Sequence, residues 1–308
     1  MAKPDFVDQR LTERRNPLTV DIDVASSSEI VDMLNAEDCT VADAVYSARD
    51  ALARTIDLVA DAFRSGGRLV YVGAGTSGRL GVLDASECPP TFGSEPEMVS
   101  GIIAGGAAAL VKSQEGAEDD GVAARIAVEE KQLGGDDVVI GIAASGTTPF
   151  VQAAVQRAQE LGAATVLVTC SDPPPELVAS CDELIVARVG PEALSGSTRL
   201  KAGTATKLIL NAITTGAMIR LGKTYGNLMV DLMTLSQKLK DRGERIVMEA
   251  GGVDRAAARR AIESAGGSVK VAVVMAKSGA DAAEARRRLE IAGGLVREVI
   301  GDPPAVLQ

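Results

Sequence analysis

The fold is decided by residues 70–79, which read VYVGAGTSGR. The apolar run at residues 70–72 is typical of a short buried strand, and three glycines punctuate the turn that follows it. Residues 140–149, IGIAASGTTP, repeat the same design. Each segment consists of an apolar strand, a small-residue turn that carries hydroxyl groups, and the start of a helix, and this succession is typical of an α/β protein.

These two turns have the chemistry of a phosphate site. Glycines let backbone N–H groups approach an anion closely, hydroxyls donate further hydrogen bonds, and a helix N-terminus adds partial positive charge. A third hydroxyl cluster, SGST at residues 195–198, precedes a long helix that bears Lys201. A single glycine-rich turn is often only a tight connection, but two copies and a third cluster together favour a ligand site.

Apolar runs separated by helical stretches predict a doubly wound parallel sheet flanked by helices. Open sheets of this kind bind ligands beyond the carboxyl ends of their strands. The aromatic content of 2% also favours aliphatic packing of helices on a sheet. The expected strands cover residues 69–72, 98–103, 138–142, 164–169 and 183–186.

The chain divides into three predicted parts. Residues 1–55 form an arm and helices, with Ser26 as a cap and a helix expected over residues 40–63. Residues 56–225 form the α/β domain, which ends in a long helix. Residues 226–308 form a small helical domain in which glycine pairs stop the helices.

Composition restricts the partners. The formal charge of −10 provides no overall basic field for nucleic acid or an anionic membrane, so an anionic ligand must be small and held by local groups. No apolar run approaches the roughly 20 residues of a spanning helix, and the first residues lack the apolar core of a secretory signal. We therefore expect a cytoplasmic location.

The chain contains no histidine, and its four cysteines are scattered without a CxxC pair. This composition predicts no metal site and excludes Ser-His-Asp and Cys-His nucleophile systems. The remaining candidate acids and bases are Glu, Asp, Lys and Tyr side chains. We interpret the cysteines as reduced structural thiols.

Two carboxylates follow the predicted strands. Glu87 precedes Pro89 and Pro90, which we expect to stop the helix and to fix Glu87 near its end. Glu118 lies in an acidic group at residues 115–120. An acidic residue near a helix start often only complements the helix dipole, so the pattern leaves open whether either glutamate is catalytic.

The spacing of Gly73, Gly75 and Gly78 also satisfies GxGxxG, the dinucleotide-binding fingerprint. That fingerprint requires an acidic residue at the end of the second strand to bind the ribose. The second predicted strand instead runs into Ala104 and two glycines. A second hydroxyl turn is not part of the fingerprint either, so this reading is disfavoured.

Several long motifs resemble one family. They are TERRNP at residues 12–17, GAGTSGRLGVLDASECPPT at 73–91, EGAED at 115–119, GIAASG at 141–146, SGSTRLKAG at 195–203 and YGNLMVD at 225–231. Together they closely resemble N-acetylmuramic acid 6-phosphate etherases over nearly the whole chain. Looser relatives are the sugar isomerase-type phosphosugar-binding domains, which include the glucokinase regulatory protein.

This resemblance implies cleavage of the D-lactyl ether of N-acetylmuramic acid 6-phosphate in cell-wall amino-sugar recycling. The implied route is elimination followed by hydration, without a metal or organic cofactor, in a homodimer whose sites lie close to the subunit interface. By motif match, Glu87 and Glu118 occupy the catalytic positions. The predicted substrate contacts are Thr76, Ser77, Ser145, Thr148, Ser197 and Lys201.

Two other functions use the same turns. A phosphosugar-sensing regulatory protein would bind without turnover and would not need the two glutamates. An aldose-ketose isomerase would also use a glutamate base but would yield a ketose. The sequence does not decide which glutamate removes a proton and which assists the leaving group.

Overall fold

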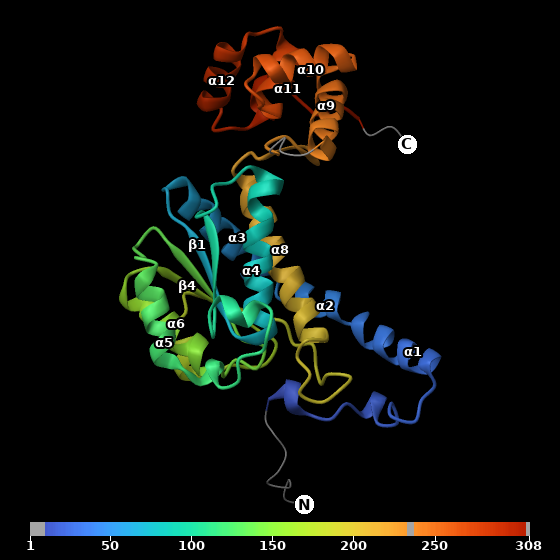
Figure 1. The fold of residues 1–308 in the computed structure, drawn as a ribbon, viewed down its shortest axis with the longest axis vertical. Helices are drawn as coiled ribbons and strands as arrows, with labels where there is room; N and C mark the ends of the chain where they lie inside the picture. The colour runs from blue at the N-terminus through green and yellow to red at the C-terminus, as the bar shows by residue number, and fades with distance from the viewer. Residues whose placement is uncertain (1–9, 233–236, 306–308) are drawn as a thin grey trace, which may run out of the picture. The chain divides into compact units, whose positions relative to one another are not determined.

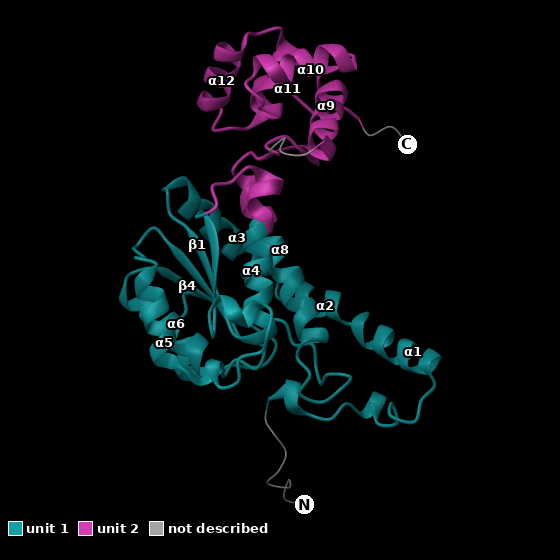
Figure 2. Cartoon of the chain, viewed as in Figure 1, with its two compact units in different colours: residues 1–86, 97–214 teal, residues 87–96, 215–308 magenta. Residues whose placement is uncertain are grey.

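The computed structural model describes residues 10–232 and 237–305, so the first nine residues of the predicted arm lie outside the described ranges. Contacts divide the chain into two compact units (Figure 2). The first unit comprises residues 1–86 and 97–214, and the second comprises residues 87–96 and 215–308. The predicted division into three parts, with boundaries at residues 55/56 and 225/226, stays a prediction, because these two units do not test it.

The first unit is built on a five-stranded sheet with the order β2-β1-β3-β4-β5, and every pairing in it is parallel. The predicted strands are confirmed to within one residue at each end. Their bounds are β1 Leu69–Gly73, β2 Val99–Ile103, β3 Val138–Ile142, β4 Ala164–Thr169 and β5 Glu183–Val186.

Helices cover both faces of this sheet (Figure 1). On one face, Val70, Val72 and Val139 pack against α5 and α6 in an aliphatic cluster that includes Phe150. On the other face lie α3, α4 and the long helix α8, which confirms a doubly wound architecture. These helices are α3 Arg49–Arg64, α4 Gly75–Phe92, α5 Gly121–Glu130, α6 Pro149–Glu160 and α8 Lys201–Arg220, with the short α7 Pro175–Val178 before β5.

The chain before the sheet contains α1 Ser27–Asp38 and α2 Val41–Tyr46. Ser26 caps α1 as predicted, since its side chain accepts from the Glu29 N–H and Glu29 accepts from Ser26 in return. The single helix expected over residues 40–63 is wrong, because the helix breaks between α2 and α3. There the Ser47 hydroxyl donates to the carbonyl oxygen of Ala44 and competes with backbone pairing.

The expectation that Pro89 and Pro90 end a helix is also wrong in its position, because α4 continues to Phe92. Proline adopts helical φ and mainly forfeits its own N–H bond, which a last turn tolerates. Gly93, at φ 60°, ends the helix instead and donates to the carbonyl oxygen of Pro89.

The second unit contains the predicted small helical domain. Its aliphatic core includes Val247, Ala272 and Val274. Its elements are the hairpin β6 Thr224–Tyr225 and β7 Leu228–Met229, then α9 Gln237–Gly251, α10 Arg255–Ser264, α11 Val269–Ser278, α12 Ala282–Ile291 and α13 Val296–Ile300. No helix in residues 10–232 or 237–305 combines the length and apolarity that crossing a membrane requires. The four cysteines all lie within the described ranges, and none of them forms a disulfide bond.

Candidate active site

The first hydroxyl turn connects β1 to α4 so tightly that it requires glycine. A Cβ atom on Gly78 would lie 2.6 Å from the carbonyl oxygen of Gly73 and 2.7 Å from Cγ1 of Ile103. Gly75, at φ +53°, begins the helix. Thr76 and Ser77, both half-buried, therefore lie in the first turn of α4.

The second hydroxyl turn connects β3 to α6. The hydroxyls of Ser145 and Thr147 are 3.0 Å apart, and Gly146 adopts φ +74° at the tip of the turn. Thr148 is the N-cap residue of α6, but its side chain makes no capping hydrogen bond. Its hydroxyl is therefore not committed to the helix.

The two turns line one cavity of about 300 Å³ at the carboxyl edge of the sheet. This cavity brings together four predicted contacts, namely Thr76, Ser77, Ser145 and Thr148. The third hydroxyl cluster contributes Gly196 and Thr198, whereas Ser197 is not among the lining residues. Because two parallel strands deliver their turns to the same edge, the hydroxyls converge as a phosphate site requires.

Glu118 also lines this cavity. It lies in a short 3-10 helix, η4 Ala117–Asp119, and its side chain is exposed. The capping role that acidic residues often play here is taken by Asp120, whose carboxylate accepts from the Ala123 N–H at the start of α5. Glu118 is thus left for the cavity.

A second cavity of about 230 Å³ shares a wall with the first. Ala74, Gly75 and Glu118 line both cavities. The remaining polar lining comes from Arg79, Ser113, Gln114 and Glu115.

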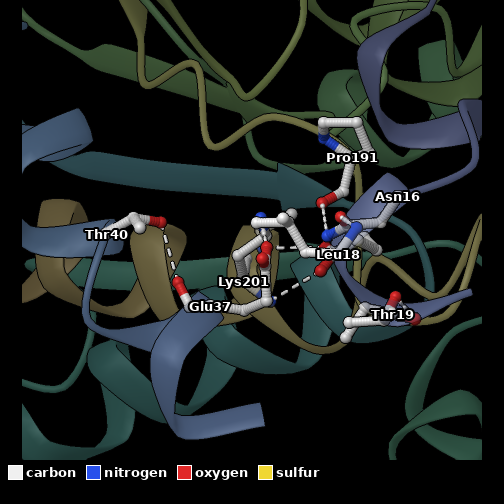
Figure 3. A network of polar contacts seen from close by, with 10 residues as sticks. Asn16, Leu18, Thr19, Glu37, Thr40, Pro191 and Lys201 are labelled. Atoms are coloured by element: carbon white, nitrogen blue, oxygen red, sulfur yellow. Dashed lines mark hydrogen bonds and ion pairs between the residues drawn. The ribbon is translucent and has the colours of Figure 1, made fainter. Parts of the chain in front are cut away.

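Lys201, the predicted cationic contact, is 3% exposed and is not among the residues that line either cavity. Its ammonium group pairs with the carboxylate of Glu37 on α1 (Figure 3). Both side chains are buried, so each compensates the charge of the other, which would be costly to bury alone. The two oxygens of Glu192, which is fully buried, accept the N–H groups of Lys201 and Ala202, each at 2.9 Å.

Residues from the predicted arm also reach the cavity, which the sequence did not predict. Arg10 and Glu13 line it, the former as the N-cap and the latter as the last residue of the first 3-10 helix, η1 Leu11–Glu13. The backbone around Glu13 is fixed to the third cluster, because the Ser195 hydroxyl donates to the Glu13 carbonyl at 2.9 Å. The TERRNP motif was the available signal, but nothing in its pattern indicated where it would dock.

A little further along, the arm is fastened to the segment before α8 (Figure 3). Asn16 is the N-cap of the second 3-10 helix, η2 Pro17–Thr19. Its side-chain oxygen accepts from the Leu18 N–H at 2.9 Å, and its amide nitrogen donates to the carbonyl oxygen of Pro191 at 3.3 Å. The buried Thr19 hydroxyl donates to the carbonyl of Ala193 at 2.8 Å. The arm and the third hydroxyl cluster therefore form one polar framework.

Glu87 lies on α4 and is exposed. Three residues earlier, Asp84 is buried and accepts from the Tyr71 hydroxyl at 2.9 Å and the Asn211 amide at 2.6 Å. Burial raises the pKa of Asp84, while these hydrogen bonds act in the opposite direction. This network, which sequence reasoning missed, joins α4 to β1 and α8. The only signal for this network in the sequence was the helical periodicity, which places Asp84 on the face of α4 that packs inward.

Two comparisons with known proteins match part of the chain. Residues 51–159 match the family model for the glucokinase regulatory protein N-terminal SIS domain. A solved structure of phosphoheptose isomerase from Neisseria gonorrhoeae superposes with a TM-score of 0.46 at 17% identity, covering 62% of this chain and 98% of that one.

Curated relatives are much closer in sequence. The N-acetylmuramic acid 6-phosphate etherase of Gloeobacter violaceus is 54% identical over 263 residues, which cover 85% of this chain and 86% of the relative. That of Thermosynechococcus vestitus is 53% identical over 266 residues, covering 85% of each chain. The resemblance seen in the motifs is thereby confirmed, and the chain belongs to the N-acetylmuramic acid 6-phosphate etherase family.

Proposed function

We propose that this enzyme cleaves the D-lactyl ether of N-acetylmuramic acid 6-phosphate, as a carbon-oxygen lyase that yields N-acetylglucosamine 6-phosphate and D-lactate in amino-sugar recycling. The observation that carries this proposal is the position of Glu118 on the wall of a hydroxyl-lined cavity in a member of the etherase family. A sugar phosphate needs such hydroxyls, and proton chemistry needs the carboxylate.

The phosphate binds in the cavity of about 300 Å³. Thr76 and Ser77 at the start of α4 offer hydroxyls and the positive end of a helix, and Ser145 and Thr148 offer the same at α6. Ser197 supports the site from the third cluster. A direct contact from Lys201 would require its ammonium group to leave Glu37.

The reaction itself uses carboxylates. In the open-chain sugar, the carbonyl at carbon 1 acidifies the proton on carbon 2, so a glutamate can remove it. The electron pair forms a double bond between carbons 2 and 3, and lactate departs from carbon 3 with the ether oxygen. Water then adds to carbon 3 and a proton returns to carbon 2. We assign these transfers to Glu87 and Glu118, and such catalysis contributes about 10² to 10⁴ in rate.

Glu87 suits a site completed by a second copy of the chain. It is exposed, and Leu83 one turn earlier on α4 is an exposed apolar residue. The family resemblance implies a homodimer with sites close to the subunit interface, so we propose that Glu87 acts at that interface. The cytoplasmic location and the independence from metal and organic cofactor stay predictions. Full activity in a chelator would support the independence from metal.

One assay tests the proposal. The purified chain is incubated with N-acetylmuramic acid 6-phosphate, and D-lactate is measured. We expect lactate from the wild type, and at least a roughly 100-fold slower release from Glu87→Gln and from Glu118→Gln. Both variants should still bind N-acetylglucosamine 6-phosphate, whereas Ser77→Ala should bind it more weakly. Full activity in either Gln variant would remove that glutamate from the mechanism.

A phosphosugar-sensing function is the second candidate, because the matched family model describes a domain of a regulatory protein. The same assay separates the two functions. Binding of the sugar phosphate without release of lactate would favour the sensor, and formation of a ketose would favour an isomerase.

A further inference from the structure

The second cavity is a subsite of the same site rather than a separate one. It shares Ala74, Gly75 and Glu118 with the hydroxyl-lined cavity, so a ligand held in one can extend into the other past Glu118. The two compartments differ in chemistry. The first is lined by hydroxyls from both turns, with Arg10 and Glu13 from the arm, whereas the second has a single hydroxyl, from Ser113, beside the guanidinium of Arg79 and the amide of Gln114.

Arg79 lines this second cavity, and its guanidinium is held there by one of its nitrogens. Its Nε donates to the carbonyl oxygen of Leu110 at 3.2 Å, which holds the half-buried side chain in place. Its two terminal amino groups make no hydrogen bond or ion pair with any residue that the structure describes. A guanidinium fixed at one nitrogen can offer the others to a planar carboxylate, the geometry that arginine binds best.

The proposed substrate has two anionic groups, the phosphate on carbon 6 and the carboxylate of the lactyl group on carbon 3. The hydroxyl turns account for the phosphate. We propose that Arg79 binds the lactyl carboxylate in the second cavity and so selects the ether substrate; this inference rests on the proposed function. The shared wall then places Glu118 between the two anions, where the ether oxygen lies.

The acidic residues of the second cavity define how Arg79 must act. Glu115 and Glu118 also line it, so the compartment has no general positive field. A carboxylate is held there only by direct contact with the guanidinium, because two nearby negative charges oppose it at longer range. Arg79→Lys should therefore keep only part of the wild-type affinity for the carboxylate, since an ammonium group cannot form the paired hydrogen bonds of a guanidinium.

The test compares N-acetylmuramic acid 6-phosphate with its lactamide analogue, in which a neutral amide replaces the carboxylate. The enzymes are wild type, Arg79→Gln, Arg79→Lys and the control Arg125→Gln, whose arginine forms an exposed ion pair with Glu160 and lines neither cavity. For Arg79→Gln we expect kcat/KM on the acid to fall by about 100-fold and on the amide by less than about threefold. Affinity for N-acetylglucosamine 6-phosphate, which lacks the lactyl group, should stay within about twofold and also shows that the variant is folded.

Three results separate the possible failures. If the wild type releases no lactate, the etherase proposal fails and this inference falls with it. If the wild type is active but Arg79→Gln loses equal activity on acid and amide, the inference alone is overturned. It is also overturned if Arg79→Gln lowers the affinity for N-acetylglucosamine 6-phosphate by as large a factor as it lowers the affinity for the substrate, because Arg79 would then serve the phosphate, the N-acetyl group or the fold.

Discussion

Replacing Lys201 with methionine should destabilise the first unit strongly, although the substitution is close in size. The ammonium group of Lys201 and the carboxylate of Glu37 form an ion pair (Figure 3). Both side chains are buried, with exposures of 4% and 8%. Removing the lysine leaves the Glu37 carboxylate buried without a counter-charge. Breaking a buried pair in this way costs about 3–5 kcal/mol.

Thermal denaturation measures this cost. At about 2 °C of Tm per kcal/mol for a large chain, we expect Lys201→Met to lower the Tm by roughly 6–10 °C. The double variant Lys201→Met with Glu37→Leu removes both charges and should recover most of that loss, because an apolar pair of similar volume is often as stable as a buried ion pair. A single variant that costs less than about 1 kcal/mol would refute the reasoning, since an exposed pair behaves that way.

The double variant also decides whether Lys201 contacts the ligand. If the lysine only fastens α1 to the start of α8, the folded double variant should bind N-acetylglucosamine 6-phosphate within about threefold of wild type. A loss of about 100-fold without a loss of stability would instead support the contact predicted from the sequence.

Gly78→Ala should lower the free energy of unfolding by about 1–3 kcal/mol and weaken phosphate binding, because its Cβ would lie 2.6 Å from a backbone oxygen. Gly134→Ala serves as the control, since its Cβ would have no atom of the described residues within 4 Å. Urea denaturation of both variants checks the difference. Cys39 should react with a thiol reagent at pH 8, because it is exposed, whereas Cys170 should stay unlabelled in the native chain, because burial raises the pKa of its thiol to about 12. Peptide mass measurement after labelling checks this, and rapid labelling of Cys170 would contradict it. Burial raises the pKa of Asp137, but hydrogen bonds from Arg68 and from backbone N–H groups outweigh it and hold the pKa below the ordinary 3.8. This lowered pKa stabilises the fold above pH 3.8 and the contribution is lost as the pH falls further, so Asp137→Asn should flatten the acid limb of a stability-pH curve, and an unchanged limb would exclude the effect.

The strands and the phosphate turns could be predicted because their signals are local. Short apolar runs and the glycines that follow them reflect backbone preferences within a few residues. Local signals of the same kind, helical periodicity and capping residues, also predicted α8 and the cap at Ser26. The convergence of Ser77, Ser145 and Glu118 followed one step later, since parallel strands end at the same edge. Helix breaks were less predictable, because small energies decide them: the hydroxyl of Ser47 and the tolerance of a last turn for two prolines.

Tertiary structure alone decided which charged groups meet. Lys201 follows a hydroxyl cluster in the sequence and looks like a ligand contact, yet a helix more than 160 positions away supplies its partner, Glu37. Likewise, the arm brings Arg10 to the hydroxyl-lined cavity, and the chain around Glu118 forms the second cavity beside Arg79. A charge interacts with whatever group lies within a few ångströms of it, and that neighbour is set by long-range packing rather than by the residues adjacent in the chain.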